Sequence, residues 1–310
     1  MFSTVLIYSV YNSPTINGFL YGLFMSLTID EKLSQDILRG IVIPPCPQIV
    51  VDIQLELALP DPDINKIADL INKDAGISGS VLKAINSPLF GLAGKVKSVT
   101  HAVSLLGLKN VVNIVTALSL KKVLSDDSIA SMNRFWDTAN DVANTATIVS
   151  KYTKLCTPDE AYSIGLFHNC GVPLMMMKFP DYMTVLEASY ASADSHIVKI
   201  ENEHYKTDHT VLGFYTAKTW TIPESLCEAI STHHCCESIF SHNPEIKTPV
   251  KNLLAVLKIS EHISNSYKTL GGSDNDYEWE QIKNHVLDYA GLFDDDIVSL
   301  VDECIEAGIV

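Results

Sequence analysis

The sequence predicts an all-α fold, and three observations support this class. Apolar side chains recur at helical spacing along most of the 310-residue chain. Segments that alternate apolar and polar residues, as strands do, are almost absent beyond residue 25. Residues that cap or end helices recur at the intervals typical of helices of ordinary length. We therefore expect one large helical domain or two packed helical subdomains.

The first half of the chain predicts a series of short helices. The apolar stripe at positions 64, 67, 68 and 71 follows an aspartate that can cap the helix. The expected boundaries, in chain order, are the capping box Thr28 and Glu31, the stop at Gly40, Pro47 in a first turn, the cap Asp63, the break at Asn86, the cap Ser98, the break at Gly107 and an end near Leu124.

The second half predicts longer helices. Thr157, Pro158 and Glu160 combine a capping box with a proline at the first helical position, a strong signal for a helix start. The other expected helices cover residues 135–152, 194–205, 208–220, 223–234, 250–267, 277–290 and 294–307. The three aspartates that open the last of these indicate an N-terminal turn favoured by the helix dipole rather than a calcium loop.

These boundaries divide the chain into three parts. Residues 1–25 form an extension of uncertain structure, 26–125 an N-terminal helical subdomain, and 126–310 a helical bundle with C-terminal helices. The extension is apolar but has no Lys or Arg, and Asn12 to Pro14 interrupt it. We therefore expect neither a signal peptide nor a membrane span, with membrane anchoring as the alternative, and we leave open whether Met25 is the natural start.

Charge and cysteine content limit the partners and the compartment. The formal net charge is −15, from 37 acidic and 22 basic side chains, which disfavours nucleic acid as a partner. The seven cysteines are odd in number and show no disulfide spacing, so we expect reduced thiols and a cytoplasmic protein.

Several landmarks in order make the chain similar to a known family, the HD-related output domain (HDOD) family. No single landmark is specific, but their order and spacing over residues 30–265 are. They are Ile43–Pro47, Asn72–Asp74, Asn86–Gly91, Ala102–Gly107, Phe135–Trp136, Gly165–Gly171, Glu203, Asp208–His209, Gly213, Trp220–Pro223, Ala229–Ile230 and His233–His234. The resemblance implies an N-terminal helical subdomain packed on a helical bundle that descends from HD-type metal phosphohydrolases.

The resemblance also implies a pocket in the bundle. In the ancestral enzymes a His–Asp pair, further histidines and a distal acid hold one or two divalent metal ions, which activate water for phosphate-ester cleavage. The positions of this chain that match are His168, Asn169, His209, His233, His234 and Glu261.

Two of the ancestral positions are substituted here. Asn169 stands where the pair has its aspartate, and a neutral amide cannot bridge two cations as a carboxylate does. Thr138 falls where the first helix should carry a histidine. We therefore expect a vestigial pocket without catalysis or cofactor, in a bacterial signal-transduction output module whose partners are signalling proteins.

Other interpretations stay open. The competing class is a divergent phosphohydrolase of nucleotides or cyclic dinucleotides, with iron, manganese or zinc on His168, His209, His233 and Glu261; a third is a nucleotide sensor without turnover. A zinc site on the run His233–Cys236 is disfavoured, because neighbouring residues on a helix point about 100° apart. Cys170 is interpreted as a buried packing thiol rather than a nucleophile.

Overall fold

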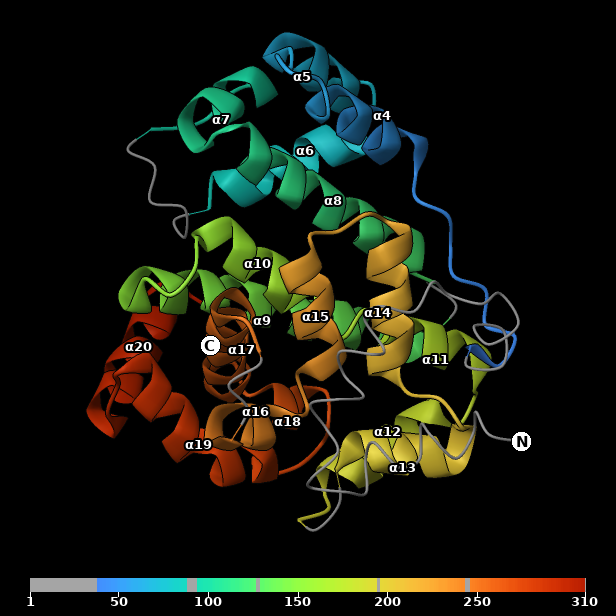
Figure 1. The fold of residues 1–310 in the computed structure, drawn as a ribbon, viewed down its shortest axis with the longest axis vertical. Coiled ribbons are helices and arrows are strands. Elements are labelled where there is room, and N and C mark those ends of the chain that lie inside the picture. Colours follow the sequence, from blue (N-terminus) through green and yellow to red (C-terminus); the bar gives the residue numbers. More distant parts are fainter. Residues whose placement is uncertain (1–37, 88–93, 127–128, 194–195, 243–245, 310) are drawn as a thin grey trace.

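The computed structural model describes residues 38–87, 94–126, 129–193, 196–242 and 246–309, and these ranges form helices joined by turns and loops (Figure 1). No strand occurs in these ranges, which confirms the all-α class. Within them, no helix is both long and apolar enough to cross a membrane. The capping box at Thr28 and the N-terminal extension lie outside the described residues.

Five helices form the upper part of the molecule in Figure 1. They are α4 (Gln48–Leu57), α5 (Ile64–Asn72), α6 (Ala75–Ile85), α7 (Val99–Leu106) and α8 (Leu108–Leu124). The predicted caps are confirmed: the Asp63 side chain accepts from the backbone of α5, and the Ser98 hydroxyl accepts from that of α7. Pro47 lies one residue earlier than predicted, as the N-cap of α4.

The remaining helices form the bundle below. They are α9 (Ala130–Thr153), α10 (Pro158–Phe167), α11 (Val172–Lys178), α12 (Tyr182–Tyr190), α13 (Ile197–Tyr205), α14 (His209–Thr219), α15 (Glu224–Thr232), α16 (Cys236–His242), α17 (Thr248–Ile263), α18 (Ser266–Thr269), α19 (Tyr277–Ala290) and α20 (Asp294–Glu306). The predicted capping box at Thr157 is present at the start of α10.

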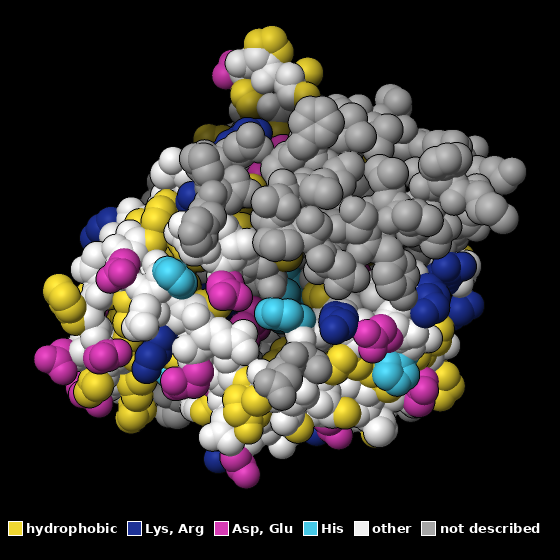
Figure 2. Space-filling model, turned by 60° about the horizontal axis from the view of Figure 1, so that its bottom comes forward, with side chains coloured by type: hydrophobic (Ala, Val, Ile, Leu, Met, Phe, Trp, Pro, Cys, Tyr) yellow, Lys and Arg dark blue, Asp and Glu magenta, His cyan; other side chains and the backbone are white. Residues whose placement is uncertain are grey.

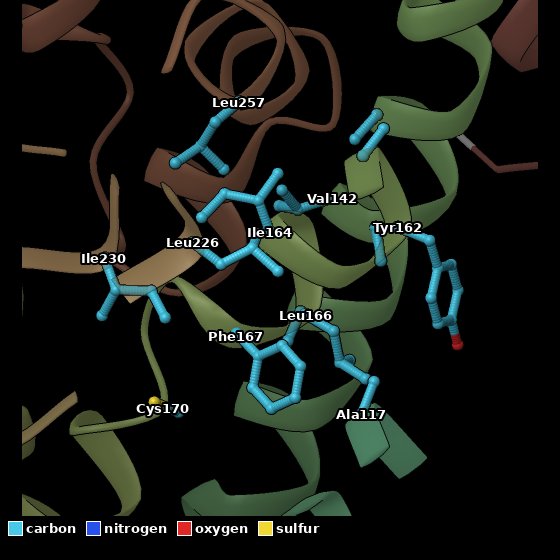
Figure 3. Packing of buried hydrophobic residues seen from close by; sticks show 14 of the residues in the cluster. Ala117, Val142, Tyr162, Ile164, Leu166, Phe167, Cys170, Leu226, Ile230 and Leu257 are labelled. Carbon is cyan, nitrogen blue, oxygen red and sulfur yellow. The ribbon is translucent and has the colours of Figure 1, made fainter. Parts of the chain in front are cut away.

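Helix α10 lies at the centre of the packing and ends at the pocket. Its Ile164 points toward Val142 of α9 and lies near Leu257 of α17 (Figure 3). Phe167, one turn later, points to the other side but belongs to the same buried cluster. Gly165 permits this arrangement, because a Cβ there would lie 2.5 Å from the Ala143 Cα. The close contact fixes the direction in which the end of α10 projects.

Polar contacts join the upper helices to the bundle. The Asn113 amide of α8 donates to Asp159 of α10 over 3.0 Å. The Trp220 indole, which is fully buried, donates to the Pro44 carbonyl over 3.0 Å. Gln54 of α4 in turn donates to the Trp220 carbonyl over 2.8 Å. These contacts bridge positions far apart in sequence and hold the N-terminal helices on the bundle.

The observed helices differ from the prediction in several respects. The helix predicted over residues 250–267 ends at Ile263 and is followed by a separate short helix, α18. The helices predicted to start at residues 135 and 194 start at Ala130 and Ile197. The helix predicted over 223–234 ends at Thr232, where the chain turns and the Cys235 N–H donates to the Thr232 carbonyl. Helices α11, α12 and α16 were not predicted; each is short, and α11 is buried along most of its length, so it lacks the polar face that reveals a helix in sequence.

Candidate functional site: a histidine and carboxylate pocket

Helix ends bring together all six residues that the sequence predicted for the pocket. His168 caps the end of α10, His209 is the first residue of α14, and His233 caps the end of α15. Asn169 and His234 follow directly in the chain, and Glu261 comes from α17. The Asn169 amide lies 3.2 Å from His233, and His168 lies 3.3 Å from Glu261.

Thr138 makes no hydrogen bond with the pocket residues in the described part of the chain. Its hydroxyl donates to the Arg134 carbonyl of its own helix over 2.9 Å and lies 3.3 Å from the Thr269 hydroxyl. The threonine is therefore engaged with α9 and α18 rather than with the histidines.

His209 is oriented by a buried carboxylate that sequence reasoning missed. Glu201 of α13 has no exposed surface, and one of its oxygens accepts from the His209 ring Nδ1 over 2.7 Å and from the His209 backbone N–H over 3.2 Å. Its other oxygen accepts from the Tyr182 hydroxyl. With Nδ1 engaged in this way, His209 presents Nε2 to the pocket.

His233 is oriented in the same sense by a main-chain carbonyl. Its Nδ1 lies 2.8 Å from the Ile230 carbonyl oxygen, which only accepts, so Nδ1 carries the proton. The Nε2 of His233 then lies 3.3 Å from the Nε2 of His209. Two lone pairs at this separation repel each other, so a proton or a cation has to lie between these nitrogens.

His234 completes a cluster of three imidazoles. Its Nδ1 lies 3.1 Å from a Glu278 oxygen, while its buried Nε2 has no hydrogen-bond partner among the described residues. The His233 and His234 rings are only 4.2 Å apart between centroids. These neighbours converge because α15 ends at Thr232, so helical spacing does not separate them. Cys235 and Cys236 do not join the cluster.

A buried lysine, also missed from sequence, lies beside the imidazoles and shares Glu278 with His234. The Lys258 ammonium is 2.8 Å from Glu261 and 2.9 Å from Glu278, with only 3% of the side chain exposed. Glu261 also pairs with His168. The pocket therefore has an imidazole half and a half in which carboxylates already hold a cation.

Burial and these partners set the protonation states. Burial and the neighbouring cationic groups hold the pKa of His233 and of His234 well below the ordinary value, so both rings are neutral. Burial acts to lower the pKa of His209, but the charge and hydrogen bond of Glu201, together with the charge of Asp208, outweigh it and raise that pKa. Burial likewise disfavours the Lys258 ammonium, but Glu261 and Glu278 outweigh it and raise the lysine pKa.

The imidazole half fits one transition-metal ion. One nitrogen from each of His209, His233 and His234 lies within 4.8 Å of the others. Each ring has its Nδ1 on an oxygen, the arrangement that metal-binding histidines usually show. Nitrogens about 2.0–2.1 Å from a tetrahedral zinc lie about 3.3 Å apart, close to the His209–His233 spacing. Such an ion would supply Lewis acidity and lower the pKa of bound water.

A second metal ion does not fit the same test. Asn169, beside His233, offers no negative charge, and the carboxylates that would compensate a second ion are paired with Lys258.

The cavity beside the pocket is small. It measures about 70 Å³ and is lined by residues of α12, α13 and α19 together with His234 and Glu278. Figure 2 turns the lower end of the molecule forward, and histidine and acidic side chains lie together near the middle of this face.

One sequence signal, present at two positions, could have revealed the missed residues. Glu201 and Lys258 both lie on apolar faces, Glu201 with Ile197 and Val198, and Lys258 with Leu254. A charged residue in such a stripe needs a buried partner. The position of Cys170 supports its interpretation as a packing thiol, because the side chain is fully buried and burial raises the pKa of the thiol.

A family model for the HDOD domain matches residues 43–236. The chain belongs to the HDOD domain family. An uncharacterized protein from Treponema pallidum (strain Nichols) is 24% identical over 250 residues; the match covers 80% of this chain but only 46% of that relative. The HDOD chain therefore spans about half the length of the curated relative.

Solved HDOD-like structures share the fold. An HDOD domain protein of unknown function from Geobacter sulfurreducens matches with a TM-score of 0.57 at 23% identity, covering 88% of this chain and 97% of that one. A provisionally named phosphohydrolase from Shewanella amazonensis SB2B matches with a TM-score of 0.62 at 19% identity, covering 88% and 96%. A provisionally named signal transduction protein from Marinobacter aquaeolei VT8 matches with a TM-score of 0.60 at 22% identity, covering 94% and 64%.

Proposed function

We propose that this HDOD chain is an interaction module of bacterial signal transduction whose pocket does not hydrolyse phosphate esters. It acts in the cytoplasm and its partners are signalling proteins. The net charge of −15 disfavours binding to nucleic acid. Its seven free cysteines support a reducing compartment. The name of the Marinobacter aquaeolei relative supports the signalling role.

The observation that carries this proposal is the neutral amide of Asn169 against His233. The resemblance requires a carboxylate at this place to bridge two cations, and an amide supplies neither the charge nor the second ligand oxygen.

A second candidate is a phosphohydrolase with a single metal ion. The Nε2 of His234 has no partner in the described part of the chain and lies beside His209 and His233. This favours the second candidate, because three imidazoles with an open fourth position are the donor set of some catalytic zinc sites. The ligand set favoured by this geometry replaces His168 and Glu261 with His234, since His168 and Glu261 pair with each other.

Turnover measurements separate the two candidates. The full chain, purified without nickel resin, is incubated with nucleotides and cyclic dinucleotides in the presence of manganese, iron or zinc. We expect no turnover with any metal and no gain over His209→Ala, whether or not one metal ion is bound. Turnover that the wild type shows and His209→Ala lacks would establish the enzyme instead. A thermal shift with a nucleotide but no turnover would identify a sensor.

A further inference from the structure

Lys258 is the one described cation enclosed by the carboxylate half of the pocket. Its Nζ lies 2.8 Å from Glu261 and 2.9 Å from Glu278, and 3% of its side chain is exposed. A charge with so little contact with water is tolerated only when it is paired. Here two anions from different helices, α17 and α19, meet on one ammonium.

The surroundings of this ammonium are those of a divalent cation site. Carboxylate oxygens from two helices suit manganese or magnesium, and His168 Nε2 lies 3.3 Å from the Glu261 oxygen that the ammonium does not contact. The lysine thus stands among the same types of ligand that a second metal ion would need.

We propose that Lys258 is a built-in cation that replaces a second divalent metal ion, so that the pocket accepts one metal ion at most. The second cation is then covalently part of the chain and cannot be exchanged or act as a Lewis acid. This inference deepens the proposed function and rests on it for the absence of a two-metal centre, although Lys258 can be tested whether or not the histidines bind a metal.

Removal of the lysine charge should create a vacant cation site. Glu261 and Glu278 then face each other without a counter-ion, and the space left by the side chain lies between them. In Lys258→Ala, a bound divalent cation would compensate the charge of the two carboxylates. Lys258→Met removes the same charge but fills most of the space. Lys258→Ala with Glu278→Gln removes one charge of each sign and one carboxylate ligand.

The test compares metal content across these variants. Each full chain is stripped with chelator and dialysed against excess manganese, and bound manganese is counted by mass spectrometry and by the electron paramagnetic resonance of the free ion. We expect Lys258→Ala to bind one manganese ion more than the wild type, and its melting temperature to rise with manganese by several degrees more than that of the wild type. The methionine variant and the double variant should gain no ion.

Equal manganese content in Lys258→Ala and the wild type would overturn the proposal. If Lys258→Ala is insoluble when it is produced without metal, manganese in the growth medium should restore its solubility. The proposal would also be overturned if manganese fails to make Lys258→Ala soluble while the double variant is soluble. The difference between variants decides the role of Lys258, whereas wild-type turnover separately decides the proposed function.

Discussion

Glu201 offers the sharpest test of how the pocket is held together. Its carboxylate is fully buried and accepts from the Tyr182 hydroxyl and from two N–H groups of His209. Glu201→Ala leaves these three donors without an acceptor, at about 1–3 kcal/mol for each one that stays dry. Water entering the space recovers part of this cost, so we expect a loss of about 3–5 kcal/mol, as for other broken buried pairs.

Urea unfolding followed by circular dichroism measures this loss. Glu201→Gln keeps the volume and one acceptor oxygen but removes the charge, so we expect a smaller loss of about 1.5–3 kcal/mol. Glu203→Ala is the matched control, because Glu203 is exposed on the same helix and should change stability by less than about 0.5 kcal/mol.

A second measurement distinguishes positioning from mere stability. If Glu201 sets the orientation of His209, Glu201→Gln should also weaken zinc binding by about 10–100-fold. A loss below about 1 kcal/mol in Glu201→Ala, or a stability no lower than that of the Glu203→Ala control, would refute the reasoning.

Three further predictions concern packing, pH and the link to the N-terminal helices. Gly171→Ala should prevent folding or lower the free energy of unfolding, measured in urea, by several kcal/mol, because the new Cβ would lie 2.0 Å from a main-chain oxygen at the start of α14. The control Gly79→Ala, whose Cβ meets nothing within 4 Å, should leave that free energy unchanged or raise it. Burial holds the pKa of His233 and of His234 low, so below about pH 6.5 the unfolded chain binds protons that the folded chain does not bind. The free energy of unfolding, measured in chelator, should therefore fall on acidification by up to about 1.4 kcal/mol per pH unit for each ring. A free energy of unfolding that stays constant from about pH 7.5 to 5.5 would contradict this. Trp220→Phe removes the indole hydrogen bond to the segment before α4 and should lower the melting temperature measured by calorimetry by several degrees, with an unchanged value counting against the link.

Local signals made much of the fold predictable. A cap such as Asp63 or Thr157 acts within one turn of its own helix, so its consequence is readable without the rest of the chain. The all-α class follows from the spacing of apolar residues for the same reason. Short buried helices such as α11 escaped prediction because burial on every side removes that spacing.

The pocket was predictable only in part. The resemblance located His168, His209 and His233, and the structure brings them together with Asn169 and Glu261. That His233 and His234 converge depends on where α15 ends, a boundary that tertiary contacts decide to within a residue or two.

The sequence alone determined the helical class, the family and the substitution of an amide at position 169, since each is a property of residues or of their order. Only the tertiary structure decided the charge balance of the pocket. Glu201 orients His209 from 8 positions away, and Glu278 reaches His234 across 44 positions of the chain. Electrostatic energy depends on distance in space and on exclusion from water, and neither is a function of distance along the chain.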